Sequence, residues 1–338
     1  GVATIGHCNP YVVEAIKKQS ETLITNPGIF YNDKRAELLE KLVTVSPEGL
    51  NRAFITNSGT EAIEAAIKFA RISTGKTEFI SAMKGFHGRT MGALSSTHKL
   101  EYREPFEPLI PGFSFVPFNK IEKLIEAVSE NTAGIILEIV QGEGGINIGS
   151  NEYFQQVRKL CDENDIILII DEIQTGFCRT GKMFACEHYN LSPDIMTVAK
   201  AIGGGFPLGA TICSDKIQIP TGKHGSTFGG NPLGAAAAIA SINYMVDEDL
   251  TKQAAEKGEY FIKKLNAERF DRVRNVRNLG LMIGIELKEK VQPILNRLME
   301  KGLLALPSGK LVLRLLPPVI ISYEEIDSVI EILEEVLE

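Results

Sequence analysis

Hydrophobic and polar positions alternate along the chain in blocks that predict strands and helices in turn. Short apolar runs have the length of strands, and amphipathic segments with apolar residues at helical spacing separate them. The expected strands are residues 52–56, 77–80, 133–138 and 165–171, and the expected helices between them are residues 61–71, 121–128 and 153–164. The last strand is apolar almost throughout, as parallel strands buried on both faces are. The pattern predicts an α/β fold with a mostly parallel mixed sheet flanked by helices.

The pattern changes toward both ends of the chain. Beyond residue 247 come a charged helix that ends at Arg269, strands at residues 272–276 and 281–287, a helix, a strand at residues 311–314 and a last helix from Tyr323. We interpret these elements as a smaller α+β domain. The predicted division is an N-terminal segment of the small domain (residues 1–35), a large domain (36–246) and a C-terminal small domain (247–338). Because the chain opens on Gly1 in what resembles the end of a folded element, we expect that a preceding segment is absent.

Composition narrows the class of protein. The 338 residues are 44% hydrophobic and 23% charged, with a net charge of −7, as in ordinary soluble globular proteins. No basic stripe suggests nucleic acid, and no apolar stretch approaches the roughly 18 residues that span a membrane. Five scattered cysteines, never in a C-x-x-C pair, favour buried free thiols in a reducing cytoplasm over disulfides or a metal site. They are Cys8, Cys161, Cys178, Cys186 and Cys213.

Lys200 ends an apolar run, residues 194–200, and a glycine-rich turn follows it at residues 201–207. An ammonium at the end of a buried strand is desolvated, which lowers its pKa and frees the amine to act as a nucleophile. Such an amine forms Schiff bases with carbonyl compounds, including pyridoxal phosphate. The alternative is that Lys200 caps a strand at the surface, and this segment alone does not separate the two.

Other polar groups follow the ends of strands, where open α/β sheets bind their ligands. Ser58, Gly59 and Thr60 open a helix whose free amides suit a phosphate, although the same residues also serve as a plain N-cap. Asp171 ends the most apolar strand, and a carboxylate there requires a cation. That cation is either a protonated pyridine nitrogen or a neighbouring arginine. Gln174, three residues on, is placed to hydrogen-bond a ring hydroxyl.

Two further segments carry groups suited to a planar anionic ligand. Phe86 offers an aromatic face for a planar cofactor, and Gly88 lets the backbone approach it, although a core role is the alternative for the aromatic. Arg89 offers a planar fork suited to carboxylates. Nothing at ligand spacing makes His87 a metal ligand. Arg314 is a charge within an apolar strand, and a buried arginine nearly always has an anionic partner.

Taken together, these segments resemble the class III pyridoxal-phosphate aminotransferases of fold type I, in particular the acetylornithine/ornithine aminotransferase family with its archaeal relatives that act on lysine or ornithine linked to an amino-group carrier protein. The resemblance runs in order along essentially the whole chain. It is carried by Asn57-Ser58-Gly59-Thr60-Glu61-Ala62, Phe86-His87-Gly88-Arg89-Thr90, Gln141-Gly142-Glu143-Gly144-Gly145, Asp171-Glu172-Ile173-Gln174-Thr175-Gly176 and Ala199-Lys200-Ala201-Ile202-Gly203-Gly204-Gly205. Five motifs in register are far more specific than any one of them.

The resemblance implies a role for each cofactor residue. Lys200 would form the Schiff base with pyridoxal 5'-phosphate and then move the proton as general acid and base. Asp171 would pair with the pyridine nitrogen, and Gln174 with the 3′-oxygen. The residues expected at the ring face and the phosphate are Phe86, with His87 beside it, and Ser58, Gly59 and Thr60.

The resemblance also implies a substrate site and a partner subunit. Arg314 would bind the α-carboxylate of glutamate or 2-oxoglutarate, and Arg89 a second carboxylate. Glu143 would neutralise Arg314 when the amine substrate occupies the site, because a bare buried arginine is costly. Thr227 would reach the phosphate of the other subunit, which implies a homodimer with its active sites at the subunit interface.

The function implied is transfer of the terminal amino group of N-acetylornithine, or of carrier-linked lysine or ornithine, to 2-oxoglutarate. The products are the semialdehyde and glutamate, in arginine or lysine biosynthesis. The alternatives are a 4-aminobutyrate or ornithine aminotransferase, an amino-acid racemase on the same scaffold, or a non-catalytic binding protein. The presence of Lys200, Asp171 and Gln174 together argues against the last.

Overall fold

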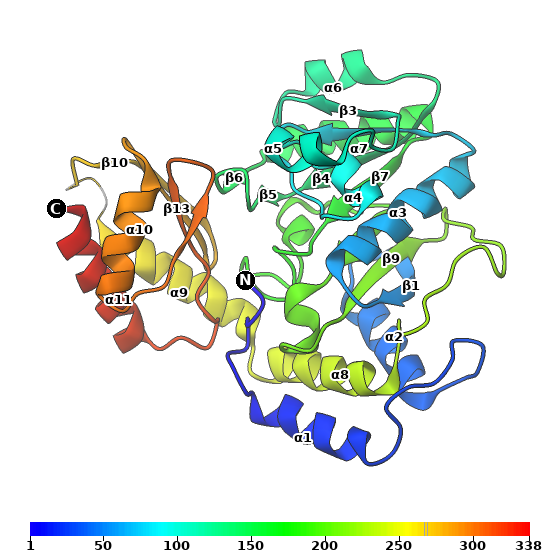
Figure 1. The fold of residues 1–338 in the computed structure, drawn as a ribbon, viewed down its shortest axis with the longest axis horizontal. Coiled ribbons are helices and arrows are strands. Elements are labelled where there is room, and N and C mark those ends of the chain that lie inside the picture. Colours follow the sequence, from blue (N-terminus) through cyan, green and yellow to red (C-terminus); the bar gives the residue numbers. More distant parts are fainter. Residues whose placement is uncertain (267, 269) are drawn as a thin grey trace.

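The computed structural model describes residues 1–266, 268 and 270–338, and it has two domains side by side (Figure 1). The large domain is built on a seven-stranded mixed sheet with the order β1-β9-β8-β7-β4-β2-β3, in which β9 alone runs against its neighbours. Its strands are β1 Leu50–Thr56, β2 Glu78–Ala82, β3 Phe113–Val116, β4 Thr132–Glu138, β7 Ile167–Asp171, β8 Ile195–Val198 and β9 Gly209–Ser214. The mostly parallel α/β sheet predicted from the sequence is confirmed.

The central strands form where the sequence is continuously apolar. Every residue of β4 and β7 is buried, and the two pair in parallel from Gly134 opposite Ile167 to Glu138 opposite Asp171. Two strands of the seven-stranded sheet escaped prediction. β3 is a short, partly exposed edge strand, and β9 carries glycine, threonine, cysteine and serine among its apolar positions. Neither therefore shows the long apolar run that revealed β7.

Helices cover the large sheet, and polar side chains cap many of them. The helices are α1 Pro10–Ser20, α2 Asp33–Val45, α3 Gly59–Thr74, α4 Met91–Ser95, α5 Leu100–Arg103, α6 Ile121–Ala127, α7 Asn151–Asn164 and α8 Pro232–Asp247. Short 3-10 turns (η1 Glu104–Phe106, η2 Ala185–Tyr189, η3 Lys200–Gly203) and the small hairpin of β5 Val140–Gln141 with β6 Asn147–Ile148 complete the domain. Ser58 caps α3 by accepting from the Glu61 amide, and Gly75 ends it with a φ of 72°.

The small domain, at the left of Figure 1, is a four-stranded antiparallel sheet with helices packed on it. Its elements are α9 Leu250–Leu265, β10 Val273–Leu279, β11 Met282–Leu287, α10 Val291–Glu300, β12 Leu306–Ser308, β13 Val312–Leu315 and α11 Tyr323–Leu337. The predicted α+β architecture is confirmed. The first helix ends at Leu265, earlier than predicted, because Asn266 adopts the left-handed conformation. The predicted end at Arg269 lies outside the described residues.

The N-terminal segment touches both domains. α1 packs against α8, whereas the carbonyl of Thr4 accepts a hydrogen bond from the Val319 amide at 2.8 Å. Arg179, a buried residue of the large domain, donates to the carbonyls of Leu281 and Pro317 and to the Thr4 hydroxyl. Burial lowers the pKa of Arg179 to about 10. The domain boundaries at residues 36 and 247 remain a prediction.

The cysteines are all free thiols, but one expectation about them is wrong. Cys161, Cys178, Cys186 and Cys213 are buried, as predicted, whereas Cys8 is exposed. Cys8 directly precedes Asn9, the N-cap of α1, and has a positive φ of 51°. No helix among the described residues is long and apolar enough to cross a membrane.

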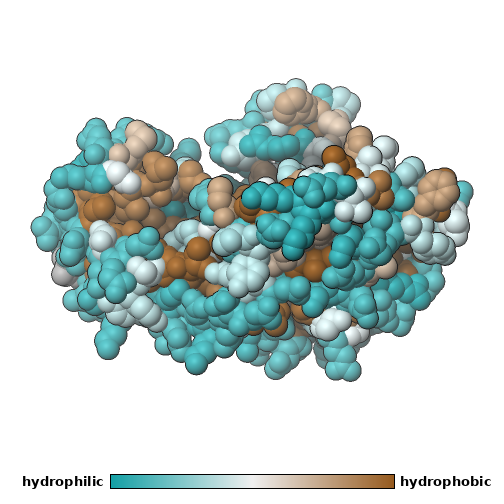
Figure 2. Space-filling view, turned by 90° about the horizontal axis from the view of Figure 1, so that it is seen from below, coloured by the Kyte–Doolittle hydropathy of each residue, from teal (hydrophilic) through white to brown (hydrophobic). Residues whose placement is uncertain are grey.

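The surface is mostly polar with local apolar patches. Seen from below, brown apolar residues gather over the small domain at the left and toward the middle of the molecule, within a largely teal surface (Figure 2). Large exposed apolar side chains include Leu304 and Leu306 of the small domain, and Ile29, Phe30 and Tyr31 between α1 and α2.

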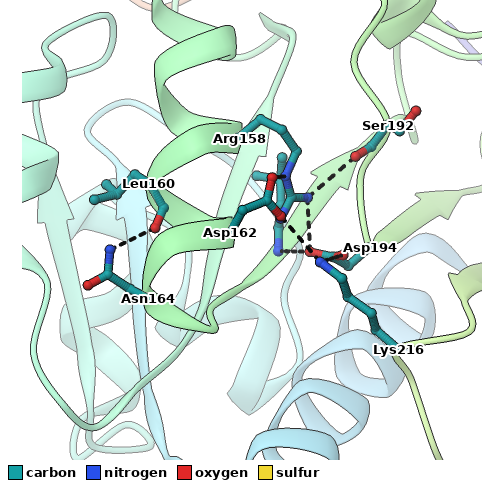
Figure 3. A network of polar contacts seen from close by, with 8 residues as sticks. Arg158, Leu160, Asp162, Asn164, Ser192, Asp194 and Lys216 are labelled. Carbon is teal, nitrogen blue, oxygen red and sulfur yellow. Dashed lines mark hydrogen bonds and ion pairs between the residues drawn. The ribbon is translucent and has the colours of Figure 1, made fainter.

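A buried aspartate ties β7 to the segments around it. Asp194 lies just before β8 and accepts hydrogen bonds from the Leu168 amide at 2.8 Å and from Arg158 Nη1 at 2.9 Å. Lys216 completes the network at 3.1 Å, and the exposed Asp162 pairs with both cations from its outer side (Figure 3). The carboxylate of Asp194 is therefore compensated on each oxygen.

Asp194→Ala is expected to destabilise the protein by roughly 3 kcal/mol, because it leaves a buried amide and a partly buried guanidinium without their acceptor. Asp162→Ala, a change in the same network at an exposed position, is expected to cost less than about 1 kcal/mol. Urea unfolding of both variants measures the difference. Equal losses would contradict the structural role given to Asp194.

Candidate active site

A cavity of about 570 Å³ opens at the carboxyl ends of β1, β2, β4, β7 and β8. Parallel strands bring the residues that follow them to one edge of the sheet, so segments far apart in sequence converge there. All the site residues predicted from the sequence line this cavity except Arg314, which borders it, and Thr227.

Lys200 follows β8 and opens the 3-10 turn η3. Its φ is 46°, a left-handed conformation that is uncommon for a residue other than glycine and that marks functional sites when the surrounding structure holds it. Burial lowers the pKa of the Lys200 ammonium, although Asp171, Glu138 and Glu143 oppose the shift. The side chain is half-buried and lines the cavity, so it is not an exposed strand cap. The amine is thus more readily deprotonated than an ordinary lysine.

Asp171 pairs with a histidine rather than with an arginine. Its Oδ2 lies 2.8 Å from His87 Nδ1, and its Oδ1 accepts from the Ile173 amide at 3.0 Å. Burial works against charge on His87, but the hydrogen bond and charge of Asp171, aided by Glu138, outweigh it and raise the pKa of His87. The buried Nε2 of His87 has no hydrogen-bond partner within the part of the chain that the structure describes.

Glu138 is a buried member of the site that the sequence analysis missed. It ends β4 as Asp171 ends β7, and the two residues are opposite each other in the sheet. Its Oε1 accepts from the Phe86 amide and its Oε2 from the Gly142 amide, both at 3.0 Å. Burial, with the nearby charge of Asp171, raises the pKa of Glu138 to about 7. The sequence signal for Glu138 is the one that identified Asp171, namely a carboxylate at the end of an apolar strand.

Glu138→Gln is expected to flatten the pH dependence of stability. A carboxyl whose folded pKa is about 7, against an ordinary 4.5, stabilises the fold fully below its unfolded pKa. That stability, roughly 3 kcal/mol at most, is lost as the pH rises from about 4.5 to about 7. Glutamine mimics the protonated form and does not titrate. Urea unfolding of the cofactor-free protein at about pH 5 and about pH 7.5 should show a smaller difference in the variant, and an unchanged difference would refute the assignment.

The N-terminus of α3 provides unpaired amides at one end of the cavity. Ser58 accepts from the Glu61 amide at 3.3 Å, but the Gly59 and Thr60 amides donate to no acceptor among the described residues. The hydroxyls of Thr60 and Thr90 lie 2.7 Å apart. A Cβ on Gly59 would come within 2.9 Å of the Ile173 side chain, so glycine lets the helix end pack closely. Free amides at a helix N-terminus form an anion site.

Apolar side chains supply the walls between these polar groups. Phe86 lines the cavity, and its backbone is fixed by Glu138. Ile173 lines it as well, and so do Phe206 and Leu208. Ile173 was not predicted, although its place between Asp171 and Gln174 was a usable signal. The walls thus form a slot suited to a flat ring.

Arg314 of β13 reaches the cavity from the small domain. The residue is 6% exposed, and its Nη1 donates to Glu143 Oε1 at 2.5 Å, to the Gly142 carbonyl at 2.7 Å and to Gln174 Oε1 at 3.2 Å. The expectation that this buried arginine has an anionic partner is confirmed. Glu143 is partly exposed and occupies the cavity side of the pair.

Arg89 and Thr227 are both exposed to solvent. Arg89 is exposed, and its Cζ lies 3.7 Å from the ring centroid of Tyr102. Thr227 is exposed and lines a separate hollow with His224 and Ser226. A single chain therefore does not bring Thr227 into the main cavity.

Comparison with known proteins identifies the family. The profile of Aminotransferase class-III matches residues 1–337. The "[LysW]-aminoadipate semialdehyde transaminase" of Deinococcus radiodurans is 50% identical over 342 residues, which cover 100% of this chain and 80% of that protein. The acetylornithine aminotransferase of Methanocaldococcus jannaschii is 50% identical over 348 residues, with 99% and 86% covered.

Solved structures of aminotransferases superimpose closely on this chain. The ornithine aminotransferase of Toxoplasma gondii ME49 superimposes with a TM-score of 0.95 at 31% identity, over 100% of this chain and 84% of that one. The taurine:2-oxoglutarate aminotransferase of Bifidobacterium kashiwanohense, solved with PLP and glutamate, superimposes with a TM-score of 0.94 at 26% identity, over 99% and 86%. The chain therefore belongs to the class-III aminotransferases and is a pyridoxal-phosphate-dependent transaminase.

Proposed function

We propose that this transaminase moves the terminal amino group of N-acetylornithine, or of carrier-linked lysine or ornithine, to 2-oxoglutarate. The observation that carries the proposal is the ion pair between the buried Arg314 and the partly exposed Glu143. The names of the relatives at 50% identity support it, and we place the reaction in arginine or lysine biosynthesis.

The residues of the cavity fit pyridoxal phosphate. The unpaired Gly59 and Thr60 amides suit its phosphate, and the slot beside Phe86 suits its ring. The carboxylate of Asp171, held by His87, would keep a proton on the pyridine nitrogen, and Gln174 would hydrogen-bond the ring hydroxyl. When bound, pyridoxal phosphate supplies a carbonyl that takes up the amino group and a ring that accepts electrons.

Within this site, Lys200 is assigned two tasks. Its amine, with a lowered pKa, holds the cofactor covalently between turnovers. Its free amine would then serve as the base for the carbon that bears the reacting amine, which is the terminal carbon of the donor and the Cα of glutamate, and as the acid that returns the proton. The glycines after Lys200 leave the residue backbone freedom, and Gly204 and Gly205 both have positive φ.

Arg314 and Glu143 allow one pocket to accept two unlike substrates. With glutamate or 2-oxoglutarate bound, Arg314 pairs with the α-carboxylate, and Glu143 moves aside. With the terminal amine bound, no carboxylate reaches Arg314, and Glu143 restores the ion pair observed here. The switch avoids an unpaired buried guanidinium in the half-reaction with the terminal amine. Arg89 is proposed to bind the distal carboxylate.

The active unit is proposed to be a cytoplasmic homodimer. Thr227 is exposed and outside the cavity, which suits a residue that serves the phosphate of the partner subunit. The exposed apolar side chains of Ile29, Phe30 and Tyr31 suit burial against a second copy.

A panel of amines on the full-length protein tests the function. N-acetylornithine, ornithine, 4-aminobutyrate and carrier-linked lysine are each added to the loaded enzyme, and the loss of the cofactor's carbonyl form is followed by absorbance. Rapid conversion by N-acetylornithine or carrier-linked lysine supports the proposal, and conversion by neither refutes it. Ornithine is the second candidate, because of the close superposition on an ornithine aminotransferase. Amino-group transfer from glutamate separates all of these from a racemase.

A further inference from the structure

Glu64 lies on α3 one turn after Thr60, so the two side chains share a face of the helix. Glutamates on helices are mostly solvated, but this one is partly buried and accepts three hydrogen bonds from a segment 26 to 29 positions away. Its Oε1 accepts from the Gly92 amide at 2.8 Å, from the Ala93 amide at 3.2 Å and from the Thr90 hydroxyl. Glu64 therefore ties a distant segment to α3.

The segment that Glu64 holds is the start of α4. Thr90 occupies the N-cap position of α4, but its side chain makes no capping hydrogen bond. The first amides of a helix have no acceptor within that helix, and the helix dipole favours a carboxylate near them. Glu64 supplies this acceptor from α3. Residues 86–90 run directly into α4, so fixing its first turn also fixes the end of the segment that carries Phe86 and Arg89.

Two glycines let this segment lie directly on α3. Gly88 has a φ of 141°, and a Cβ there would collide with the Thr60 side chain. A Cβ on Gly92 would collide with the Glu64 carboxylate. Side chains larger than hydrogen are thus excluded at both points. The segment is therefore seated on the same end of α3 that presents the unpaired amides of the candidate phosphate site.

The hydroxyl protons of Thr90 and Thr60 follow from counting donors. A hydroxyl has one proton to donate, and an ionised carboxylate only accepts. The Thr90 proton goes to Glu64, so across the 2.7 Å between the two hydroxyl oxygens the Thr60 proton goes to Thr90. Thr60 Oγ1 also accepts from the Thr90 amide at 3.3 Å. The Thr60 hydroxyl thus has no proton left for a phosphate, whereas the Gly59 and Thr60 amides have no acceptor in the described part of the chain.

We propose that Glu64 is a positioning residue for the cofactor. Through the two threonine hydroxyls and the first turn of α4, it locks the segment that carries Phe86 onto the phosphate end of α3. We call these contacts the Glu64 clamp. The clamp leaves the phosphate to the backbone amides of Gly59 and Thr60, because the Thr60 hydroxyl is already used. This inference rests on the proposed function only for the places of the cofactor's ring and phosphate.

Glu64→Ala should weaken cofactor binding, although it removes a negative charge beside a site for an anion. Charge alone would make the variant bind pyridoxal phosphate more tightly. Loss of the clamp should instead weaken binding by about tenfold or more. Pyridoxal, which lacks the phosphate, should lose a similar factor, because the part released is the ring face. Equilibrium dialysis on the full-length protein freed of cofactor measures both affinities. The visible circular dichroism of the bound cofactor should also fall, because it depends on a fixed environment around the ring.

A matched control removes a carboxylate elsewhere. Glu163→Ala changes an exposed residue of α7 and should leave both affinities and the circular dichroism as they are in the wild type. Two results for Glu64→Ala would overturn the clamp. One is cofactor affinity equal to that of Glu163→Ala, and the other is tighter binding of pyridoxal phosphate with unchanged circular dichroism, which is the effect of charge alone.

Two threonine variants of nearly unchanged volume test the chain of hydroxyls, and they serve even if Glu64→Ala fails to fold. Thr90→Val and Thr60→Val should each weaken pyridoxal phosphate and pyridoxal alike, by about threefold or more. The double variant should lose little more than either single variant, because all three break the same chain. No loss in either single variant would overturn the clamp. A loss in Thr60→Val that is confined to pyridoxal phosphate and adds in full to that of Thr90→Val would overturn the assignment of the phosphate to the amides.

The binding measurements contain no amine donor, so they are independent of which donor the enzyme uses. If no amine of the panel is converted, the proposed function fails, and the affinities of the Glu64, Thr90 and Thr60 variants still decide the clamp. If Glu64→Ala binds both cofactor forms as the control does, the clamp fails, and the assignment of the donor is untouched.

Discussion

Lys200→Ala is expected to reduce transamination by about 10⁴-fold or more, because it removes both the covalent anchor and the group that moves the proton. Cofactor binding should survive, since the amides of α3, the slot beside Phe86 and the carboxylate of Asp171 are untouched. Single-turnover absorbance with glutamate measures the chemical step, and equilibrium dialysis measures retention of the cofactor.

Two comparisons sharpen the Lys200 experiment. Lys159→Ala removes an exposed lysine of α7 and should leave the rate unchanged. A small amine such as methylamine, added to Lys200→Ala, should restore part of the proton-transfer rate, because the cavity of about 570 Å³ leaves room for it where the side chain was. Turnover of Lys200→Ala at the wild-type rate would refute the assignment of Lys200 as the catalytic lysine.

Arg314→Ala should lower kcat/KM for glutamate and 2-oxoglutarate by roughly 10²- to 10³-fold, or about 3 to 4 kcal/mol. The reason is that the α-carboxylate of the substrate loses the buried guanidinium with which it pairs. Arg314→Lys keeps the charge but not the planar fork, so an intermediate loss is expected. The terminal-amine half-reaction should change much less. Measuring the two half-reactions separately shows how much of the loss falls on each.

For Glu143→Gln, the loss should be larger in the terminal-amine half-reaction than in the glutamate half-reaction. The substitution leaves Arg314 without a countercharge in the free site and when the terminal amine is bound, whereas glutamate brings its own carboxylate, so a loss of roughly tenfold relative to glutamate should fall on the amine half-reaction. The glutamate half-reaction should hold or improve. Equal losses in both half-reactions for either variant would mean that the pair of Arg314 and Glu143 is structural rather than a substrate switch.

The elements that the sequence predicted best are those whose pattern is set by burial alone. β4 and β7 are apolar at nearly every position, so their type and place follow from the sequence. Because parallel strands end at one edge, Asp171 and Lys200 were expected at the same site, and they do line one cavity. The sheet's antiparallel member β9 has no such run and depends on pairing with β1 and β8.

What escaped prediction depends on contacts between distant residues. Glu138 is opposite Asp171 only through the register of β4 and β7. Arg314 meets Gly142 across 172 positions of sequence, and the partner of Asp171 comes from His87, 84 positions away. The stacking of Arg89 on Tyr102 follows from the course of α4 and α5. Local pattern carries no information on such pairs, because the tertiary fold decides them.

The contacts of Arg179 have a consequence for cooperativity. One buried guanidinium holds carbonyls of the small domain at Leu281 and Pro317 and a hydroxyl of the N-terminal segment at Thr4. Separating the domains would break these hydrogen bonds to a charged donor, which contribute more than hydrogen bonds between neutral groups. The small domain is therefore expected to unfold together with the large domain rather than on its own, with Arg179 as one of the contacts that couple the two.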